Sequence, residues 1–222
     1  MTKFAVIENF VPESFQDHLE QVFYDQKMLG PLWSFSTLTS GTRRQVARWQ
    51  EAISEYRVEE SPQLVCVQMG NDQVMHQTWV DIRPLTWFFE QVTNARITAI
   101  NRVKVNLNPI NQSWENKIHP PHSDVGSYVE QKMPNKNKMF SMIYYIKDGD
   151  GPTVIFDRTL DDFEHKKLPL SVIGEVIPKK GRAIILPSDL LHAGTNPVTT
   201  DCRIVANLVC TFDRTIDLKE LM

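Results

Sequence analysis

The second half of the chain is a series of short apolar runs separated by turn residues, and this pattern limits the folds that the chain can adopt. Apolar and polar side chains alternate in some of these runs, whereas others are compact and aromatic. The runs cover residues 100–106, 140–146, 153–156, 171–177, 182–186 and 202–212. Glycine and proline stand between them, as in residues 178–181 and 194–197. Several short strands with regular turn signals predict a β-sandwich or barrel.

Helical patterns precede this β-rich part. Residues 4–10 predict a short strand, and apolar residues at helical spacing follow over residues 15–23. A second helix is expected over residues 79–92, with Pro84 in its first turn. Turn signals break residues 30–80 into weakly periodic pieces, so we expect long loops there.

The order of these elements predicts an α+β, mainly β fold. We expect a double-stranded β-helix, which is a jelly-roll or cupin-like barrel, with supporting N-terminal helices. The two runs on either side of turn residues 147–152 are predicted to pair as a hairpin. A chain of 222 residues is long enough for one core, so a single domain is expected over residues 1–222. Within it, residues 1–97 would support a core formed by residues 98–213.

Composition restricts the partners and the compartment. The formal net charge is −3, so the chain lacks the basic surface typical of nucleic-acid binding, and nucleic acid is not expected as a partner. No apolar segment has the length of a signal peptide or a membrane span, and no membrane association is expected. The three cysteines are widely spaced and form no metal-binding or disulfide pattern. We therefore predict a cytoplasmic protein, and the sequence leaves its oligomeric state open.

Two histidines and one aspartate form a candidate metal site. His122 and Asp124 are two residues apart, so an extended segment would point both side chains to the same side. His192 follows the predicted strand at residues 182–186. Two imidazoles and one carboxylate on one face of a metal are the ligands of non-haem Fe(II) oxygenases. The alternative is that His122 and Asp124 are solvated loop residues, because such a pair often arises by chance.

An arginine in the last predicted strand is a candidate anion site. Alternation over residues 202–212 places Arg203, Val205 and Asn207 on one face. An arginine that points into a barrel needs a partner, because an isolated buried charge is costly. A dicarboxylate would supply that partner, because a carboxylate forms a bidentate ion pair with a guanidinium. The alternative is an ordinary structural salt bridge.

The chain resembles the iron(II)- and 2-oxoglutarate-dependent oxygenases, close to their prolyl 4-hydroxylase-like branch. The resemblance covers roughly residues 98–213, together with the strand and helix at the start of the chain. It rests on motifs in the family's order, which are His122-x-Asp124, residues 142–147, the Gly149 and Gly151 turn, residues 187–192, and Arg203.

This resemblance implies a function and a set of site residues. The implied metal ligands are His122, Asp124 and His192, and no catalytic residue is implied beyond the metal site. The residues implied to bind the co-substrate are Arg203, Tyr145, Asn106 and Asn207; many relatives carry a tyrosine near the position of Asn106. The implied reaction hydroxylates a C–H bond of a peptidyl residue or small molecule and decarboxylates 2-oxoglutarate to succinate and CO2. Fe(II), 2-oxoglutarate and O2 would be required, with ascorbate as an optional reductant.

Two other functions remain open at this point. One is a catalytically inactive jelly-roll binding protein. The other is a cupin-type metal enzyme that does not use 2-oxoglutarate, which would have no need of Arg203. Loops carry specificity in most barrels, so residues 30–80, 109–121 and 125–138 are expected to contact the substrate.

Overall fold

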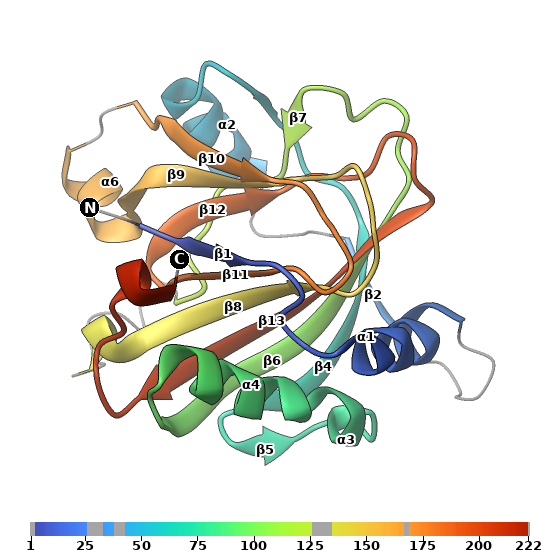
Figure 1. The fold of residues 1–222 in the computed structure, drawn as a ribbon. Coiled ribbons are helices and arrows are strands. Elements are labelled where there is room, and N and C mark those ends of the chain that lie inside the picture. Colours follow the sequence, from blue (N-terminus) through green and yellow to red (C-terminus); the bar gives the residue numbers. More distant parts are fainter. Residues whose placement is uncertain (1–2, 26–32, 38–42, 126–134, 167–168, 222) are drawn as a thin grey trace.

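One large antiparallel sheet runs through the computed structural model of the chain (Figure 1). The structure describes residues 3–25, 33–37, 43–125, 135–166 and 169–221. Within these ranges the sheet has eight strands, and β5 (Gln73–Val74) joins it by pairing with β4. The other strands, in spatial order, are β1 (Ala5–Ile7), β11 (Ala183–Pro187), β8 (Met139–Tyr145), β13 (Cys202–Phe212), β6 (Ile97–Pro109), β4 (Gln63–Gly70) and β2 (Ser34–Ser36).

A second, smaller sheet lies across from the large one (Figure 1). Its strands, in spatial order, are β10 (Val172–Val176), β9 (Thr153–Thr159) and β12 (Leu190–Gly194). Apolar side chains of both sheets share one cluster, for example Ile143 and Val205 of the large sheet with Ile155 of the small one. A short parallel pair, β3 (Arg57–Val58) and β7 (Lys117–Ile118), accompanies them. Two facing antiparallel sheets form the jelly roll that the sequence predicts.

Helices cover the outer faces of both sheets. They are α1 (Glu13–Glu20), α2 (Arg43–Ala52), α3 (Trp79–Ile82), α4 (Pro84–Thr93) and α6 (Leu160–Lys166), with the short helical turns η1 (Gln21–Asp25), η2 (Lys136–Lys138) and η3 (Leu218–Leu221). Leu19, Ile82 and Phe89 belong to the core of the large sheet, whereas Trp49 and Phe163 pack on the small sheet. In the described ranges, no helix is long and apolar enough to cross a membrane. The α+β, mainly β fold with supporting N-terminal helices is confirmed.

The central strand β6 divides its side chains between the two faces of the large sheet, as alternation requires. Val103 and Val105 are fully buried in the core beneath the helices. Lys104, Asn106 and Asn108 point the other way and line a cavity between the two sheets. One face of β6 therefore stabilises the fold, and the other supplies polar groups to an internal space.

The neighbouring strand β13 follows the same rule. Ala206 and Leu208 are buried in the core beneath the helices. Arg203, Val205 and Asn207 line the same cavity as the polar residues of β6. The face that alternation predicted for these three residues is therefore the inner face of the barrel.

The prediction of long loops over residues 30–80 is wrong. Helix α2 and the eight-residue strand β4 lie within this stretch, and β4 pairs with β6 in the large sheet. The apolar pattern of β4 is irregular because its register shifts between Val67 and Met69, and because Gln63 and Gln68 are buried. A bulge of this kind removes the period of two on which strand prediction depends.

The predicted hairpin around residues 147–152 is also wrong. Strand β8 pairs with β11 and β13, whereas β9 pairs with β10 and β12. The turn therefore carries the chain from the large sheet to the small one. Gly151 allows a close crossing there, since a Cβ atom on it would lie 2.9 Å from the backbone nitrogen of Pro197. Turn residues indicate where a chain reverses, but they do not indicate which sheet receives the next strand.

The remaining strand predictions are confirmed, with small shifts at the ends. The expected strands are present as β1, β6, β8, β9, β10, β11 and β13. The helix predicted over residues 79–92 is divided into α3 and α4, because Pro84 begins a new helix, where its missing N–H costs nothing. Strand β12, which carries His192, was not predicted.

Candidate metal centre

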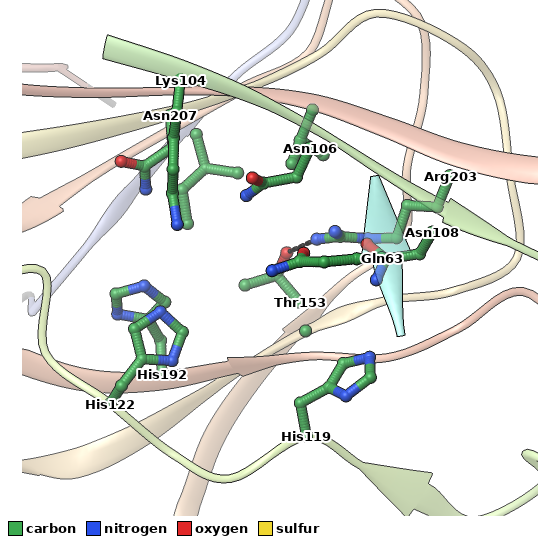
Figure 2. A pocket seen from close by; sticks show the side chains of 13 residues that line it. Gln63, Lys104, Asn106, Asn108, His119, His122, Thr153, His192, Arg203 and Asn207 are labelled. Atoms are coloured by element: carbon green, nitrogen blue, oxygen red, sulfur yellow. Dashed lines mark hydrogen bonds between the residues drawn. The ribbon is translucent and has the colours of Figure 1, made fainter. Parts of the chain in front are cut away.

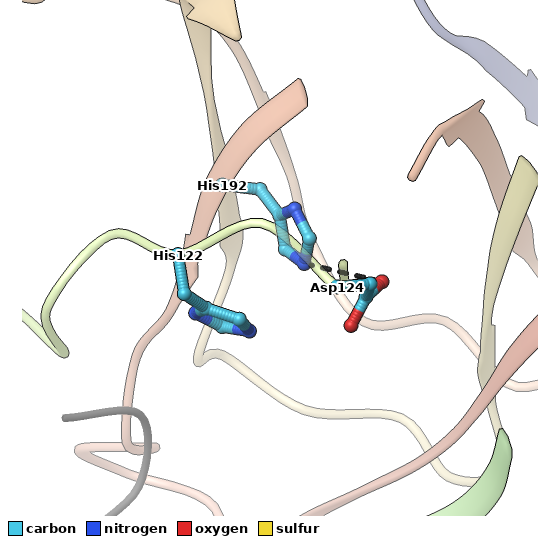
Figure 3. Close-up of side chains that lie close together, drawn as sticks. All are labelled: His122, Asp124 and His192. Carbon is cyan, nitrogen blue, oxygen red and sulfur yellow. Dashed lines mark ion pairs between the residues drawn. The ribbon is translucent and has the colours of Figure 1, made fainter. Parts of the chain in front are cut away.

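Three potential metal ligands from two parts of the chain lie close together (Figure 3). His122 and Asp124 lie on the segment that follows β7, and His192 lies on β12. One ligand atom from each residue lies within 4.8 Å of the other two. The Nε2 atom of His192 is 3.7 Å from Oδ2 of Asp124. Within the described ranges, these residues are the one group of three or more His, Cys, Asp or Glu side chains with this spacing.

Backbone hydrogen bonds hold the two ligand segments together. The N–H of His122 donates to the carbonyl of His192, and the N–H of His192 donates back, both over 3.0 Å. The N–H of Asp124 donates to the carbonyl of Ser188 over 2.9 Å. The segment after β7 is therefore bonded along β12 by its main chain. Substitution of a ligand side chain leaves these bonds in place.

Hydrogen bonding fixes which nitrogen of His192 can bind a metal. Its Nδ1 lies 3.0 Å from the carbonyl of Leu190, and a carbonyl can only accept, so Nδ1 carries the proton. The lone pair is then on Nε2, which faces Asp124. An imidazole oriented in this way is typical of metal-bound histidines.

His122 has the properties of a neutral ligand. Burial, with a further contribution from His192, lowers the pKa of His122 to about 3, so the ring is neutral at neutral pH. Its Nδ1 is buried and has no hydrogen-bond partner in the described part of the chain. A buried nitrogen without a partner destabilises the fold. A metal or its bound water beside the nitrogen would remove this cost.

Asp124 is held as a carboxylate by its neighbours. Nη2 of Arg102 donates to Oδ1 of Asp124 over 2.7 Å, and Nδ2 of Asn207 lies 3.2 Å from Oδ1 and 3.1 Å from Oδ2. Burial alone would raise the pKa of Asp124, but His192, Arg102 and His122 together lower it below its usual range. Two imidazoles and one carboxylate are the donors that Fe(II) takes in oxygenases, so the residues present fit this metal.

We expect Arg102→Gln to weaken metal binding by roughly 10–100-fold, the usual effect of losing a group that orients a metal ligand. The substitution removes the guanidinium of Arg102, which donates to Oδ1 of Asp124 and so helps to orient this carboxylate. Calorimetric titration with Mn(II) would measure the change. The matched control is Arg57→Gln, which removes an exposed arginine paired with Glu59. Equal affinities in the two variants would contradict the role given to Arg102.

A cavity lined by His119, His122 and His192 extends across the inner face of the large sheet (Figure 2). In the register of β6 and β13, Asn207 lies opposite Lys104, and Arg203 lies opposite Asn108. The first pair lies at the end of the cavity near His122, and the second lies at the other end (Figure 2). The two candidate histidine ligands and Arg203 therefore line the same cavity, and Asp124 lies next to the histidines.

Arg203 is a buried cation whose partners are neutral. Its side chain is 5% exposed, with Nε donating to the carbonyl of Gly151 over 2.8 Å and Nη2 donating to Oγ1 of Thr153 over 2.7 Å. Burial lowers the pKa of the guanidinium. No carboxylate of the described residues pairs with it, so the ordinary salt bridge is not seen there. A buried guanidinium in this state favours an anionic ligand.

The other residues implied to bind the co-substrate occupy different places. Tyr145 is fully buried, and its hydroxyl donates to the carbonyl of Val176 over 2.9 Å and lies 2.6 Å from Oγ1 of Thr153. It thus contacts the same hydroxyl that accepts from Arg203. Asn106 lines the cavity, and its buried Oδ1 has no partner in the described residues. Asn207 lines the cavity and also holds Asp124 in place.

Sequence reasoning missed several residues of this site. For Arg102 and Lys104 the sequence predicts only a place in an alternating strand, and for Thr153 only the start of a later strand. Their signal was the polar half of the alternation over residues 102–108, which is equally typical of a solvated face. Only pairing with β13 places that half inside the barrel.

His119 also lines the cavity and is expected to make stability depend on pH. It is 1% exposed, its Nε2 lies 3.0 Å from Oδ1 of Asn196, and burial, reinforced by Arg203, lowers its pKa to about 3. Since the unfolded chain binds this proton near pH 6.5 and the folded chain does not, stability rises with pH between about 3 and 6.5. Below pH 6, this group lowers the free energy of unfolding by on the order of 1 kcal/mol for each pH unit.

Urea unfolding at pH 7 and pH 5 would measure this dependence. The free energy of unfolding should change less between pH 7 and pH 5 in His119→Gln than in the wild type. The matched control is His18→Gln, because His18 is exposed and pairs with Asp81. An unchanged difference in His119→Gln would contradict the assignment.

Comparisons with known proteins bear on the fold. No protein family model matches the sequence, and no curated protein matches it. A prolyl hydroxylase from Trichoplax adhaerens, solved with a peptide of hypoxia inducible factor, has a TM-score of 0.53 at 14% identity, over 99% of this chain and 86% of that chain. A viral collagen prolyl hydroxylase from Paramecium Bursaria Chlorella virus-1, solved as a 2OG complex, has a TM-score of 0.50 at 17% identity, over 95% of this chain and 96% of that chain.

A third structure, EctD from S. alaskensis with bound Fe, has a TM-score of 0.53 at 15% identity, over 94% of this chain and 72% of that chain. The three similarities cover nearly the whole chain. They confirm the fold that the resemblance implies, since two of these structures are prolyl hydroxylases. The chain therefore has the double-stranded β-helix of the proteins that the sequence resembles.

Proposed function

We propose that the protein is an Fe(II)- and 2-oxoglutarate-dependent oxygenase. The observation that carries the proposal is one cavity lined by His122 and His192 and by the buried guanidinium of Arg203. A carboxylate oxygen of Asp124 lies within 4.8 Å of a nitrogen of each histidine, and no carboxylate among the described residues pairs with Arg203. A metal and a dicarboxylate would satisfy these groups together. Structures of the same fold that hold Fe or 2OG support the assignment.

Each part of the cavity has a separate role in this reaction. His122, Asp124 and His192 hold the metal, and Arg203 binds the 5-carboxylate of 2-oxoglutarate. When bound, Fe(II) couples the activation of O2 to the oxidative decarboxylation of 2-oxoglutarate to succinate and CO2 and to the oxidation of the substrate. None of the protein's side chains is required as an acid or base, so their work is binding, orientation and exclusion of water.

The remaining residues support the co-substrate. Tyr145 and Arg203 both bond to the hydroxyl of Thr153, so Tyr145 supports the carboxylate site by holding Thr153 in place. Asn106 lines the cavity that the co-substrate would occupy, and its side-chain carbonyl oxygen has no partner among the described residues. Asn207 contributes by holding Asp124.

The substrate is a peptidyl residue or a small molecule, and the reaction is hydroxylation of a C–H bond. A structure of the same fold that holds a peptide supports this class. The three cysteines are free and buried, which supports a reducing, cytoplasmic location. An inactive binding protein is disfavoured because all three candidate metal ligands are present. A cupin-type enzyme that does not use 2-oxoglutarate is disfavoured because it would have no need of Arg203.

Titration of the Mn(II)-loaded protein with 2-oxoglutarate tests the proposal without the need for a substrate. We expect saturable binding at one site per chain, which disappears when the metal is removed. Succinate formation by the Fe(II) form, measured with a panel of substrates, then tests turnover. Failure of the metal-loaded protein to bind 2-oxoglutarate would overturn the proposal.

A further inference from the structure

A second cation faces the cavity and has no role in the scheme above. Lys104 lies on the inner face of β6, beside Asn106 and opposite Asn207. It makes no hydrogen bond and no ion pair with any residue in the part of the chain that the structure describes. A lysine that lines an internal cavity in this way lacks the partner that a charge removed from bulk water needs.

Lys104 and Arg203 lie at different ends of the cavity (Figure 2). In Figure 2 the side chain of Lys104 lies on the same side of the cavity as His122 and His192, whereas Arg203 lies beside Thr153. Arg203 is therefore placed for the far end of 2-oxoglutarate, and Lys104 is placed beside the metal ligands. One dicarboxylate bound to the metal and to Arg203 leaves Lys104 available.

The charges of the loaded site lead to the same conclusion. Fe(II) and Arg203 together balance Asp124 and the dianion 2-oxoglutarate. The charge of Asp124 is used in this balance although Asp124 also pairs with Arg102 at 2.7 Å, so Arg102 and Lys104 both remain in excess. Of these two cations, Lys104 is the one that lines the cavity. The loaded cavity thus keeps an excess positive charge at the place where the substrate must approach the metal. An anionic group on the substrate would neutralise it.

We infer that Lys104 is a specificity-determining residue that binds a carboxylate of the substrate next to the metal. The inference rests on the proposed function and narrows its substrate class to molecules or peptidyl residues that carry a carboxylate close to the oxidised C–H bond. A monoanion suits a single ammonium, which acts as a point charge and lacks the planar fork that arginine offers. The competing source of a carboxylate is 2-oxoglutarate itself.

Two variants and one control separate these sources. Lys104→Met keeps the length of the side chain and removes the charge, and Lys104→Arg restores a charge. Lys219→Met removes a charge from the short helix η3 near the C-terminus, far from the cavity in sequence and fold. Calorimetric titration of each Mn(II)-loaded protein with 2-oxoglutarate is the first measurement. We expect affinities within about twofold of the wild type in all three, because separate sites act independently.

Substrate recognition is the second measurement. The probes are N-acetyl-L-amino acids and the matching N-acetyl-L-amino acid amides, titrated into the protein loaded with Mn(II) and 2-oxoglutarate. At least one acid should bind the wild type at least about tenfold more tightly than its amide, as expected for an ion pair in a confined site. Lys104→Met should lose this preference, whereas Lys104→Arg and Lys219→Met should keep it.

Each other outcome overturns the inference. A loss of 2-oxoglutarate affinity in Lys104→Met would assign Lys104 to the co-substrate. Acids that bind no better than their amides, or a preference that survives in Lys104→Met, would remove the carboxylate role. Failure of the wild type to bind 2-oxoglutarate at all would instead refute the proposed function, so the two failures are distinguishable.

Discussion

Replacement of His192 with alanine is expected to abolish metal-dependent turnover of 2-oxoglutarate while the barrel stays folded. The variant loses one of three ligands, and metal affinity should fall by more than the roughly 100-fold limit seen when only an orienting group is removed. The backbone bonds between His192 and His122 remain, so β12 stays in place. The cost to stability should be about 1–3 kcal/mol, as for other buried truncations. Titration with Mn(II), succinate formation and thermal unfolding measure the three effects.

His18→Ala is the matched control for this experiment. His18 is exposed on α1 and pairs with Asp81, far from the cavity. It should bind Mn(II) and turn over 2-oxoglutarate as the wild type does. Normal turnover in His192→Ala would show that another residue is the third ligand.

Replacement of Arg203 with methionine is expected to lower the affinity for 2-oxoglutarate at least about 100-fold and to leave the affinity for Mn(II) unchanged. Truncating one partner of a buried, hydrogen-bonded charge pair costs about 2–5 kcal/mol or more. Arg203 touches Gly151 and Thr153 but none of the three ligands, so the metal site should be unaffected. Titration of the Mn(II)-loaded variant with 2-oxoglutarate measures the loss.

Two further variants sharpen this test. Tyr145→Phe removes a hydroxyl that reaches the same threonine as Arg203, and a neutral hydrogen bond of this kind contributes only about 1 kcal/mol, so a loss of less than tenfold is expected. Arg57→Met removes an exposed guanidinium and should have no effect. If Arg203→Met bound 2-oxoglutarate as the wild type does, Arg203 would be structural, and the proposed function would lose the observation on which it depends.

The sequence was sufficient for those features that depend on a local period. Alternation over β13 placed Arg203, Val205 and Asn207 on one face, and the structure has all three in the cavity. The strand at β8 was equally clear, because its seven residues are all buried and apolar residues dominate it. Such patterns are decided within a few residues, so no knowledge of distant contacts is needed.

Features that depend on pairing between distant segments were not predictable in the same way. The residues after β8 predict a turn, and a turn is present, but the choice between the two sheets depends on contacts of β9 with β10 and β12. The polar face that carries Arg102 and Lys104 was ambiguous for the same reason. The spacing of His122 and Asp124 predicted a shared metal, but their position against His192 depends on an isolated bridge between residues seventy positions apart.

The two faces of β13 constrain how this protein can change over time. The same strand carries Arg203 and Asn207 toward the cavity and Ala206 and Leu208 toward the helices. An insertion or deletion of one residue would exchange these two sets of side chains. It would bury a charge in the hydrophobic core beneath the helices and remove the anion-binding group from the cavity. Evolution can therefore retune the strand by substitution, whereas changes of length are tolerated only in the connecting segments.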